Sequence, residues 1–370
     1  MKGGGRVNLW FKGKQRVFFL LISFVVLTSL LLAGCTKEDA QAVNGSLAAA
    51  PSSEKDADAS STLVIGAYSV AKDALQELIP VFQAEWEQKT GQKLTIQESY
   101  EASGTQARSI AGGMEADVAL FAMEGDVNKL IEADLVSSDW QKQDPYAGMV
   151  TESIVVIGTR EGNPLQIKDW EDLKKSNVDV LYPNPKTSGG AQWDINAIYG
   201  AGLKQAEALN VDGPAYAKQL LSGIHDRVIS MDKSGRASMA AFEYGVGDAI
   251  VTYENELLAR IKQGVPYEIV VPEHTIQIEN PVVVVDRYVD KHGTREAAEA
   301  FVAFLRSQEA QEIWVKAGFR PVNEQVKAEL KEQIAAPEGL FTIEDMGGWE
   351  HIRESLYSKR GIWYQVLAGL

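Results

Sequence analysis

The chain has very few cysteines and histidines. Cys35 is the only cysteine in 370 residues, so no disulfide can form within the chain. The four histidines, His225, His274, His292 and His351, lie in separate segments without the spacing of zinc ligands or of a serine–histidine pair. No Gly-x-Ser-x-Gly elbow and no nucleotide-binding Gly-x-x-x-x-Gly-Lys-[Ser/Thr] loop is present. We therefore expect no metal, no cofactor and no catalytic centre.

Basic residues are also scarce. The sequence has 36 Lys and Arg against 51 Asp and Glu, and no basic stripe with interleaved aromatic residues. Five of the basic residues lie in the first 34 positions, so the rest of the chain carries 31 basic and 51 acidic residues, a net charge of −20. This balance argues against nucleic acid as a partner. It also means that any bound anion must be held by local dipoles rather than by the overall field.

Residues 1–34 combine basic residues with a long apolar run and contain no acid. This pattern predicts a secretion signal, and an uncleaved membrane anchor is the alternative. The run ends in Leu-Ala-Gly-Cys at positions 32–35, which resembles the lipobox of bacterial lipoproteins, where cleavage precedes a lipid-bearing cysteine. We expect Cys35 to carry the lipid. Residues 36–61 lack aromatic and nearly all large aliphatic side chains, so residues 35–61 are predicted to form a flexible tether.

From residue 62 onward, short apolar runs alternate with longer amphipathic ones. Alternation of this kind predicts an α/β fold with a mostly parallel sheet flanked by helices. We expect strands at residues 63–68, 94–97, 116–121, 152–158, 178–181, 228–231, 249–252, 268–271 and 281–285. The main helices before residue 230 are expected at residues 70–89, 103–111, 126–133, 188–209 and 213–222.

Residues 183–193 contain the most informative pattern. Two prolines hold the chain extended, and Ser188 is a favoured N-cap for the helix that follows. Gly189 and Gly190 have no side chains to screen their N–H groups from a ligand. A helix start of this kind attracts phosphate-like or sulfate-like anions. For one such turn alone, an ordinary capped helix is the simpler interpretation.

Three further strand-to-helix junctions carry a small hydroxyl residue, at Ser69, Ser103 and Ser234, the last followed by Gly235. Ligands of open α/β sheets bind beyond the carboxyl ends of the strands, where all four junctions are expected to lie. Their N–H and O–H donors could converge on one small anion.

The octapeptide at residues 184–191, Asn-Pro-Lys-Thr-Ser-Gly-Gly-Ala, resembles the signature of periplasmic sulfate-binding proteins, the receptors of sulfate and thiosulfate ABC transporters. Further blocks similar to that family follow in order, at residues 89–92, 103–104, 107–108, 162–164, 169–173, 245–248, 254–256, 293–295, 320–321, 340–345 and 347–349. The resemblance extends from residue 62 to about residue 353.

The resemblance implies a two-lobed periplasmic-binding-protein fold of type II, in which each lobe is a mixed sheet flanked by helices. Residues 62–150 would form the first part of lobe 1, residues 151–275 lobe 2, and residues 276–370 the second part of lobe 1 with C-terminal helices. The anion would lie between the lobes, bound by Ser69, Ser103, Ser188, Gly189, Gly190, Gly235 and Tyr253. The expected protein is a monomeric receptor, lipid-anchored at the extracytoplasmic face of the cell membrane, whose partners are sulfate or thiosulfate, an ABC permease and its ATPase subunits.

Some positions depart from the sulfate pattern. Ser69 replaces an aspartate, Tyr253 a tryptophan and Gln192 an arginine, and Glu101-Ala102 replaces a glycine pair. Serine and tyrosine at the first two positions are similar to the related molybdate-binding proteins, so a molybdate or tungstate receptor stays an alternative. A site made only of donors suits a fully ionised dianion, whereas protonated phosphate needs an acceptor, which Glu101 would supply if it turned inward. A lipid-anchored hydrolase with Ser188 as nucleophile is the alternative of a different class.

Overall fold

The computed structural model describes residues 61–142, 144–332, 334 and 336–370. The predicted signal segment, Cys35 and all but the last residue of the predicted tether lie outside these residues. No helix within the described part of the chain has the length and apolar character needed to cross a membrane.

The first part of the fold is a parallel three-stranded unit with β1 in the middle. Its strands and connecting helices are β1 (Ser61–Tyr68), α1 (Lys72–Thr90), β2 (Leu94–Glu101), α2 (Ser103–Ala111), β3 (Val118–Leu120) and α3 (Glu124–Glu132). The apolar residues of α1 recur at helical spacing, and Leu75, Leu78 and Phe82 are buried. Gly91 ends this helix with a φ of 71°, a backbone conformation that glycine adopts without strain.

A second parallel unit has β5 in the middle, between β6 and β7. Its elements are β5 (Val180–Leu181), α4 (Gly189–Leu209), α5 (Gly213–His225), β6 (Val228–Ser230), α6 (Gly235–Glu243), β7 (Ala249–Tyr253) and α7 (Glu254–Lys262). The helix α4 buries most of its length and packs closely on α5.

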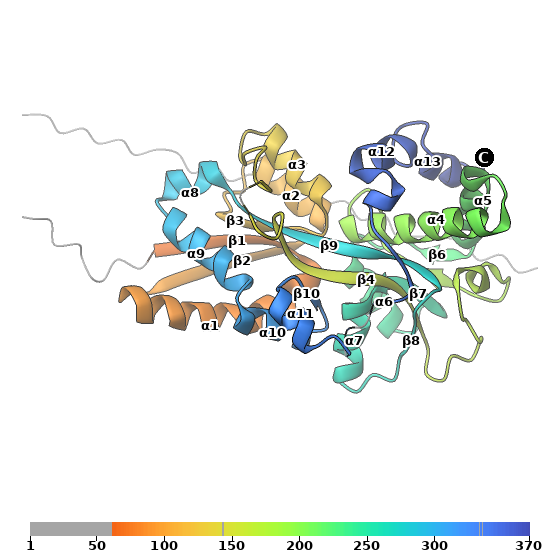
Figure 1. Ribbon diagram of the computed structural model, residues 1–370, viewed down its shortest axis with the longest axis horizontal. Helices are drawn as coiled ribbons and strands as arrows, with labels where there is room; N and C mark the ends of the chain where they lie inside the picture. The colour runs from red at the N-terminus through yellow and green to blue at the C-terminus, as the bar shows by residue number, and fades with distance from the viewer. Residues whose placement is uncertain (1–60, 143, 333, 335) are drawn as a thin grey trace, which may run out of the picture. The chain divides into compact units, whose positions relative to one another are not determined.

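Two long antiparallel strands, β4 (Met149–Thr159) and β9 (His274–Val284), join the two parallel units. The strand β9 pairs with β3 at its C-terminal end, and β4 pairs with β7 at its own. The resulting order is β2-β1-β3-β9-β4-β7-β5-β6, with β8 (Glu268–Val270) also on β4. Figure 1 shows β4 and β9 alongside each other between the helices of the two units. The expectation of a mostly parallel sheet therefore holds at both ends and is wrong in the centre, and the mixed-sheet expectation is confirmed.

The strand β9 begins seven residues earlier than the sequence pattern predicts. Polar residues in its first half and Pro281 hide it, because proline cannot donate to a strand ladder. In the structure Pro281 faces Met149, at the point where the register of β4 shifts. This irregularity makes room for proline inside a long strand.

The remaining elements divide between the two units. They are α8 (Asp286–His292), α9 (Arg295–Leu305), α10 (Gln308–Lys316), β10 (Arg320–Pro321), α11 (Glu324–Glu329), β11 (Gly339–Phe341), α12 (Gly348–Ser355) and α13 (Ile362–Leu367). The helices α9 and α10 pack on α1, with the rings of Phe82 and Phe301 5.0 Å apart. In contrast, α12 and α13 lie against α4 and α5, where Trp349 meets the Trp193 ring edge-on at 4.8 Å.

Candidate functional site

A small cavity lies where the first helical turns of both parallel units meet. It is lined by Tyr68, Ser69, Val70, Ala102, Ser103, Ala122, Pro183, Ser188, Gly190, Asp194, Ser234, Gly235, Thr252, Tyr253 and Glu256. Its volume, taken as the space open to the centre of a water-sized sphere, is about 20 Å³. One water needs roughly 10–15 Å³ by this measure, so the cavity suits a ligand of only a few atoms. No lysine, arginine or histidine is among these lining residues.

The start of α4 forms one wall of the cavity. Ser188 is extended, caps the helix and accepts a hydrogen bond from the Ala191 N–H at 3.3 Å, as its position in the sequence predicts. Its hydroxyl proton is not used in this bond. Gly190 lies in the first turn, and a Cβ there would be 3.3 Å from the Ser188 Oγ and 3.4 Å from the Tyr253 ring. Glycine at this position therefore keeps the cavity open.

The start of α6 lies beside the start of α4. Ser234 caps α6 by accepting from the Ala237 N–H at 3.2 Å, and Gly235 is its first residue. Two hydrogen bonds join the loops before these helices. The Asn184 N–H donates to the Asp232 carbonyl at 2.8 Å, and the Thr187 hydroxyl donates to the Lys233 carbonyl at 2.8 Å. Two helix N-termini thus present backbone N–H groups and positive dipole ends to the same cavity.

Ser69 and Ser103 line the cavity from the first parallel unit, but neither of them caps a helix. Ser69 opens a short 3₁₀ turn behind Tyr68, and Ser103 is the first residue of α2 behind Ala102. The Ser103 hydroxyl donates to Asp126 and accepts from the Ala122 N–H at 2.8 Å. Of the four hydroxyl residues at strand-to-helix junctions, only Ser188 and Ser234 cap a helix with their side chains.

Gly189 is the one predicted site residue that does not line the cavity. A Cβ there would lie 3.0 Å from the Asp126 Oδ2 and 3.0 Å from the Met123 Cγ. Its lack of a side chain lets the start of α4 pack against the segment before α3. The other six predicted residues come together around the cavity.

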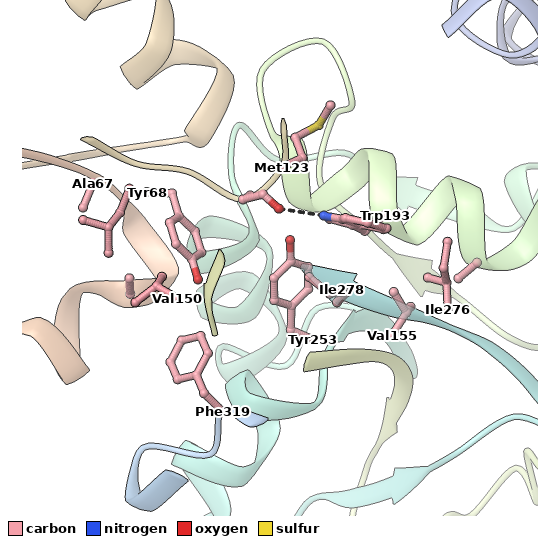
Figure 2. Close-up of a cluster of buried hydrophobic side chains, with 14 of the residues drawn as sticks. Ala67, Tyr68, Met123, Val150, Val155, Trp193, Tyr253, Ile276, Ile278 and Phe319 are labelled. Atoms are coloured by element: carbon pink, nitrogen blue, oxygen red, sulfur yellow. Dashed lines mark hydrogen bonds between the residues drawn. The ribbon is translucent and has the colours of Figure 1, made fainter. Parts of the chain in front are cut away.

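Tyr253 ends β7 and directly precedes α7. Only 3% of the residue is exposed, and its hydroxyl makes no hydrogen bond of good geometry within the described part of the chain. Figure 2 shows this hydroxyl directed toward the segment where the Trp193 indole donates to the Ala122 carbonyl, a bond of 2.7 Å. Burial raises the pKa of the Tyr253 hydroxyl well above its usual value. The group therefore stays protonated and can donate to an anion.

Two acidic residues that sequence reasoning missed, Asp194 and Glu256, also line the cavity. Burial raises the pKa of both carboxyl groups. Glu256 lies 3.6 Å from the Arg236 guanidinium and 3.8 Å from that of Arg260, and these cations counteract the rise. By contrast, Glu101, the acceptor considered from the sequence, is exposed and is not among the lining residues.

The sequence did contain a signal for these two acids, namely their spacing from Gly190 and from Tyr253. Asp194 follows Gly190 by four residues on one helix face, and Glu256 follows Tyr253 by three.

The fold is that of the periplasmic binding proteins. The periplasmic binding protein AfuA of Actinobacillus pleuropneumoniae superposes with a TM-score of 0.54 at 19% identity, over 80% of this chain and 96% of that one. The chain belongs to the bacterial extracellular solute-binding protein family, whose model matches residues 63–320.

Within this family, the chain is similar to sulfate-binding and thiosulfate-binding proteins. A sulfate-binding protein of Synechococcus elongatus is 39% identical over 82% of this chain and 86% of its own length. A thiosulfate-binding protein of Pseudomonas aeruginosa is 33% identical over 84% and 93%. The solved sulfate-binding protein SubI of Mycobacterium tuberculosis superposes with a TM-score of 0.73 at 33% identity, over 80% of this chain and all of that one.

Proposed function

We propose that this protein binds sulfate or thiosulfate in the cavity and delivers it to an ABC permease driven by ATPase subunits. The observation that carries the proposal is a cavity of a few atoms' size, lined by two helix starts and several hydroxyls and by no cationic side chain. Helix N-termini hold anions through their free N–H groups and dipoles. The sulfate-binding and thiosulfate-binding relatives support this choice of ligand.

Backbone donors and neutral side chains would hold the anion. Within the proposal, Ser69, Ser188 and Tyr253 contribute hydroxyl groups, and Gly190 and Gly235 contribute N–H groups. The predicted roles of Ser103 and Gly189 are less direct. Ser103 would act through its N–H, because its hydroxyl is bonded to Asp126. Gly189 would act through its N–H or by letting α4 approach closely.

The two parallel units correspond to the two lobes of the proposal, and β4 and β9 would connect them. Donors from both lobes surround one ligand, so the closed arrangement binds it more tightly than an open one. Only such a difference in affinity shifts the balance between open and closed states. Within this proposal the receptor works as a monomer, held at the extracytoplasmic face of the cell membrane by a lipid on Cys35.

A molybdate or tungstate receptor is the second candidate. Ser69 and Tyr253, the two positions that depart from the sulfate pattern, both line the cavity. Larger tetrahedral dianions carry the same charge as sulfate and would use the same donors. The hydrolase alternative would need a general base beside Ser188, and none of the four histidines, which all lie in the described part of the chain, is among the lining residues.

Competitive isothermal titration calorimetry tests the proposal. The purified protein is titrated with sulfate, thiosulfate, molybdate, tungstate and phosphate at pH 7. We expect sulfate or thiosulfate to bind most tightly and phosphate most weakly. Tighter binding of molybdate would favour the second candidate, and an absence of binding by every dianion would contradict the receptor function itself.

A further inference from the structure

Asp194 occupies a position in α4 from which it can reach the ligand. It follows Gly190 by four residues, so both lie on one face of the helix, and helical side chains lean toward the N-terminus. Gly190 has no side chain, so nothing of its own separates the Asp194 carboxyl group from the first turn of α4. Asp194 is 1% exposed, lines the cavity, and its Oδ1 has no hydrogen-bond partner within the described residues.

Among the described residues, no cation acts on the Asp194 carboxyl group to offset the effect of its burial. Tyr182, Tyr253 and Tyr357 lie close enough for the Asp194 charge to raise the pKa of each hydroxyl. Glu256 faces the same cavity and Asp126 acts on Tyr253, so both add negative charge. His225, bonded to the Tyr182 hydroxyl at 2.6 Å, has its own pKa lowered by burial.

An ionised Asp194 would repel a dianion in the same small cavity. Burial alone already favours the neutral carboxyl and raises its pKa well above the usual value. A bound dianion raises that pKa further, since like charges disfavour each other in a dry site. The neutral carboxyl then has one O–H to donate and can add to the donors that the two helix starts present to the cavity.

We propose that Asp194 is a further ligand of the bound oxyanion, donating a hydrogen bond as a carboxylic acid, so that binding of a fully ionised anion takes up one proton. In the empty cavity the carboxyl group of Asp194 loses its proton at high pH and becomes a carboxylate. When sulfate enters, a proton from the buffer returns to the carboxylate and no covalent bond changes. The inference rests on the proposed function, since it names a residue that would contact the same anion.

Calorimetry with sulfate across pH 5 to 9.5, in pairs of buffers with different ionisation heats, tests the inference. Above the pKa of Asp194 in the empty cavity, the affinity should fall about tenfold per pH unit while proton uptake approaches one. Asp194→Asn keeps the shape and an N–H donor but cannot titrate. We expect this variant to take up no proton and to bind sulfate with an affinity independent of pH.

Glu256→Gln is the matched control, because it removes the other buried carboxyl of the cavity. This variant should keep the proton uptake of the unaltered protein. Uptake that persists in Asp194→Asn, or that disappears only in Glu256→Gln, would overturn the inference. So would an unaltered protein that binds sulfate without taking up a proton at any pH, a measurement that requires no variant. Absence of sulfate binding by the unaltered protein at every pH would instead contradict the proposed function.

Discussion

Replacing Gly190 with alanine should weaken sulfate binding without destabilising the folded protein. The new Cβ would lie 3.3 Å from the Ser188 Oγ and 3.6 Å from the Tyr253 hydroxyl, contacts that need only slight adjustment. Alanine is also a better helix former than glycine, by up to roughly 1 kcal/mol in a helix interior. The folded state of Gly190→Ala should therefore be as stable as that of the unaltered protein, or slightly more stable.

Sulfate binding, in contrast, should be clearly weaker in Gly190→Ala. The methyl group would stand among the donors of a cavity of about 20 Å³ and would push the anion away from at least one of them. A hydrogen bond to a charged group is worth roughly 1.5–3 kcal/mol, and 1.4 kcal/mol corresponds to tenfold in affinity. We expect the dissociation constant for sulfate to rise roughly 10-fold to 150-fold.

The assay combines calorimetry with sulfate and thermal unfolding without it. Gly213→Ala is the matched control, because Gly213 also opens a helix, lies outside the cavity, and its Cβ would be 3.4 Å from Leu203. The control should bind sulfate normally. An unchanged dissociation constant in Gly190→Ala, with the protein folded, would refute the placement of the anion at the start of α4.

Three further predictions concern single residues. Tyr253→Phe removes a buried hydroxyl that makes no hydrogen bond of good geometry within the described residues, so we expect unchanged stability but sulfate binding weaker by roughly tenfold or more in calorimetry; equal affinities would mean that the ring only packs. Gly189→Ala puts a methyl 3.0 Å from Asp126 and Met123, and should lower the free energy of unfolding by about 1–3 kcal/mol in urea; a stable variant would contradict the close packing. His292 lies 2.8 Å from Asp117 and 2.9 Å from Glu115, which raise its pKa. Its stabilising contribution is full below about pH 6.5 and is lost as the pH rises through the raised value, so His292→Gln should flatten the dependence of the free energy of unfolding on pH above about 6.5.

The sequence predicted those contacts of the site that form between residues close together in the chain. A serine before two glycines after a buried strand favours a helix cap, and Ser188 forms one because every group involved lies within four residues. Ser103 has the same residue type, yet its hydroxyl is bonded to Asp126, 23 positions along the chain. Sequence spacing alone gives no access to that partner.

The fold, too, could be predicted only where it depends on residues close together in the chain. Alternating strands and helices predicted both parallel units, but the antiparallel centre depends on which distant strands meet. The first half of β9 became a strand because β11 and β4 offer it partners, against the polar residues and Pro281 that favour a loop. Asp194 was missed for a related reason. An acid in a helix is normally on the surface. Its spacing from Gly190 puts Asp194 on the helix face of the site, but its burial depends on the packing of Tyr182, Tyr253 and Tyr357 around it.

The two hydrogen bonds between the loops before α4 and α6 bear on how fast the receptor can bind and release its ligand. Because Asn184 is hydrogen-bonded to Asp232 and Thr187 to Lys233, contacts within the protein itself hold the two helix starts side by side, and a ligand is not needed to align them. The loss of chain freedom needed to align them occurs once, when the protein folds, and is not repeated at each capture. A carrier that must release its cargo in every transport cycle can therefore bind tightly without a slow rearrangement of this wall.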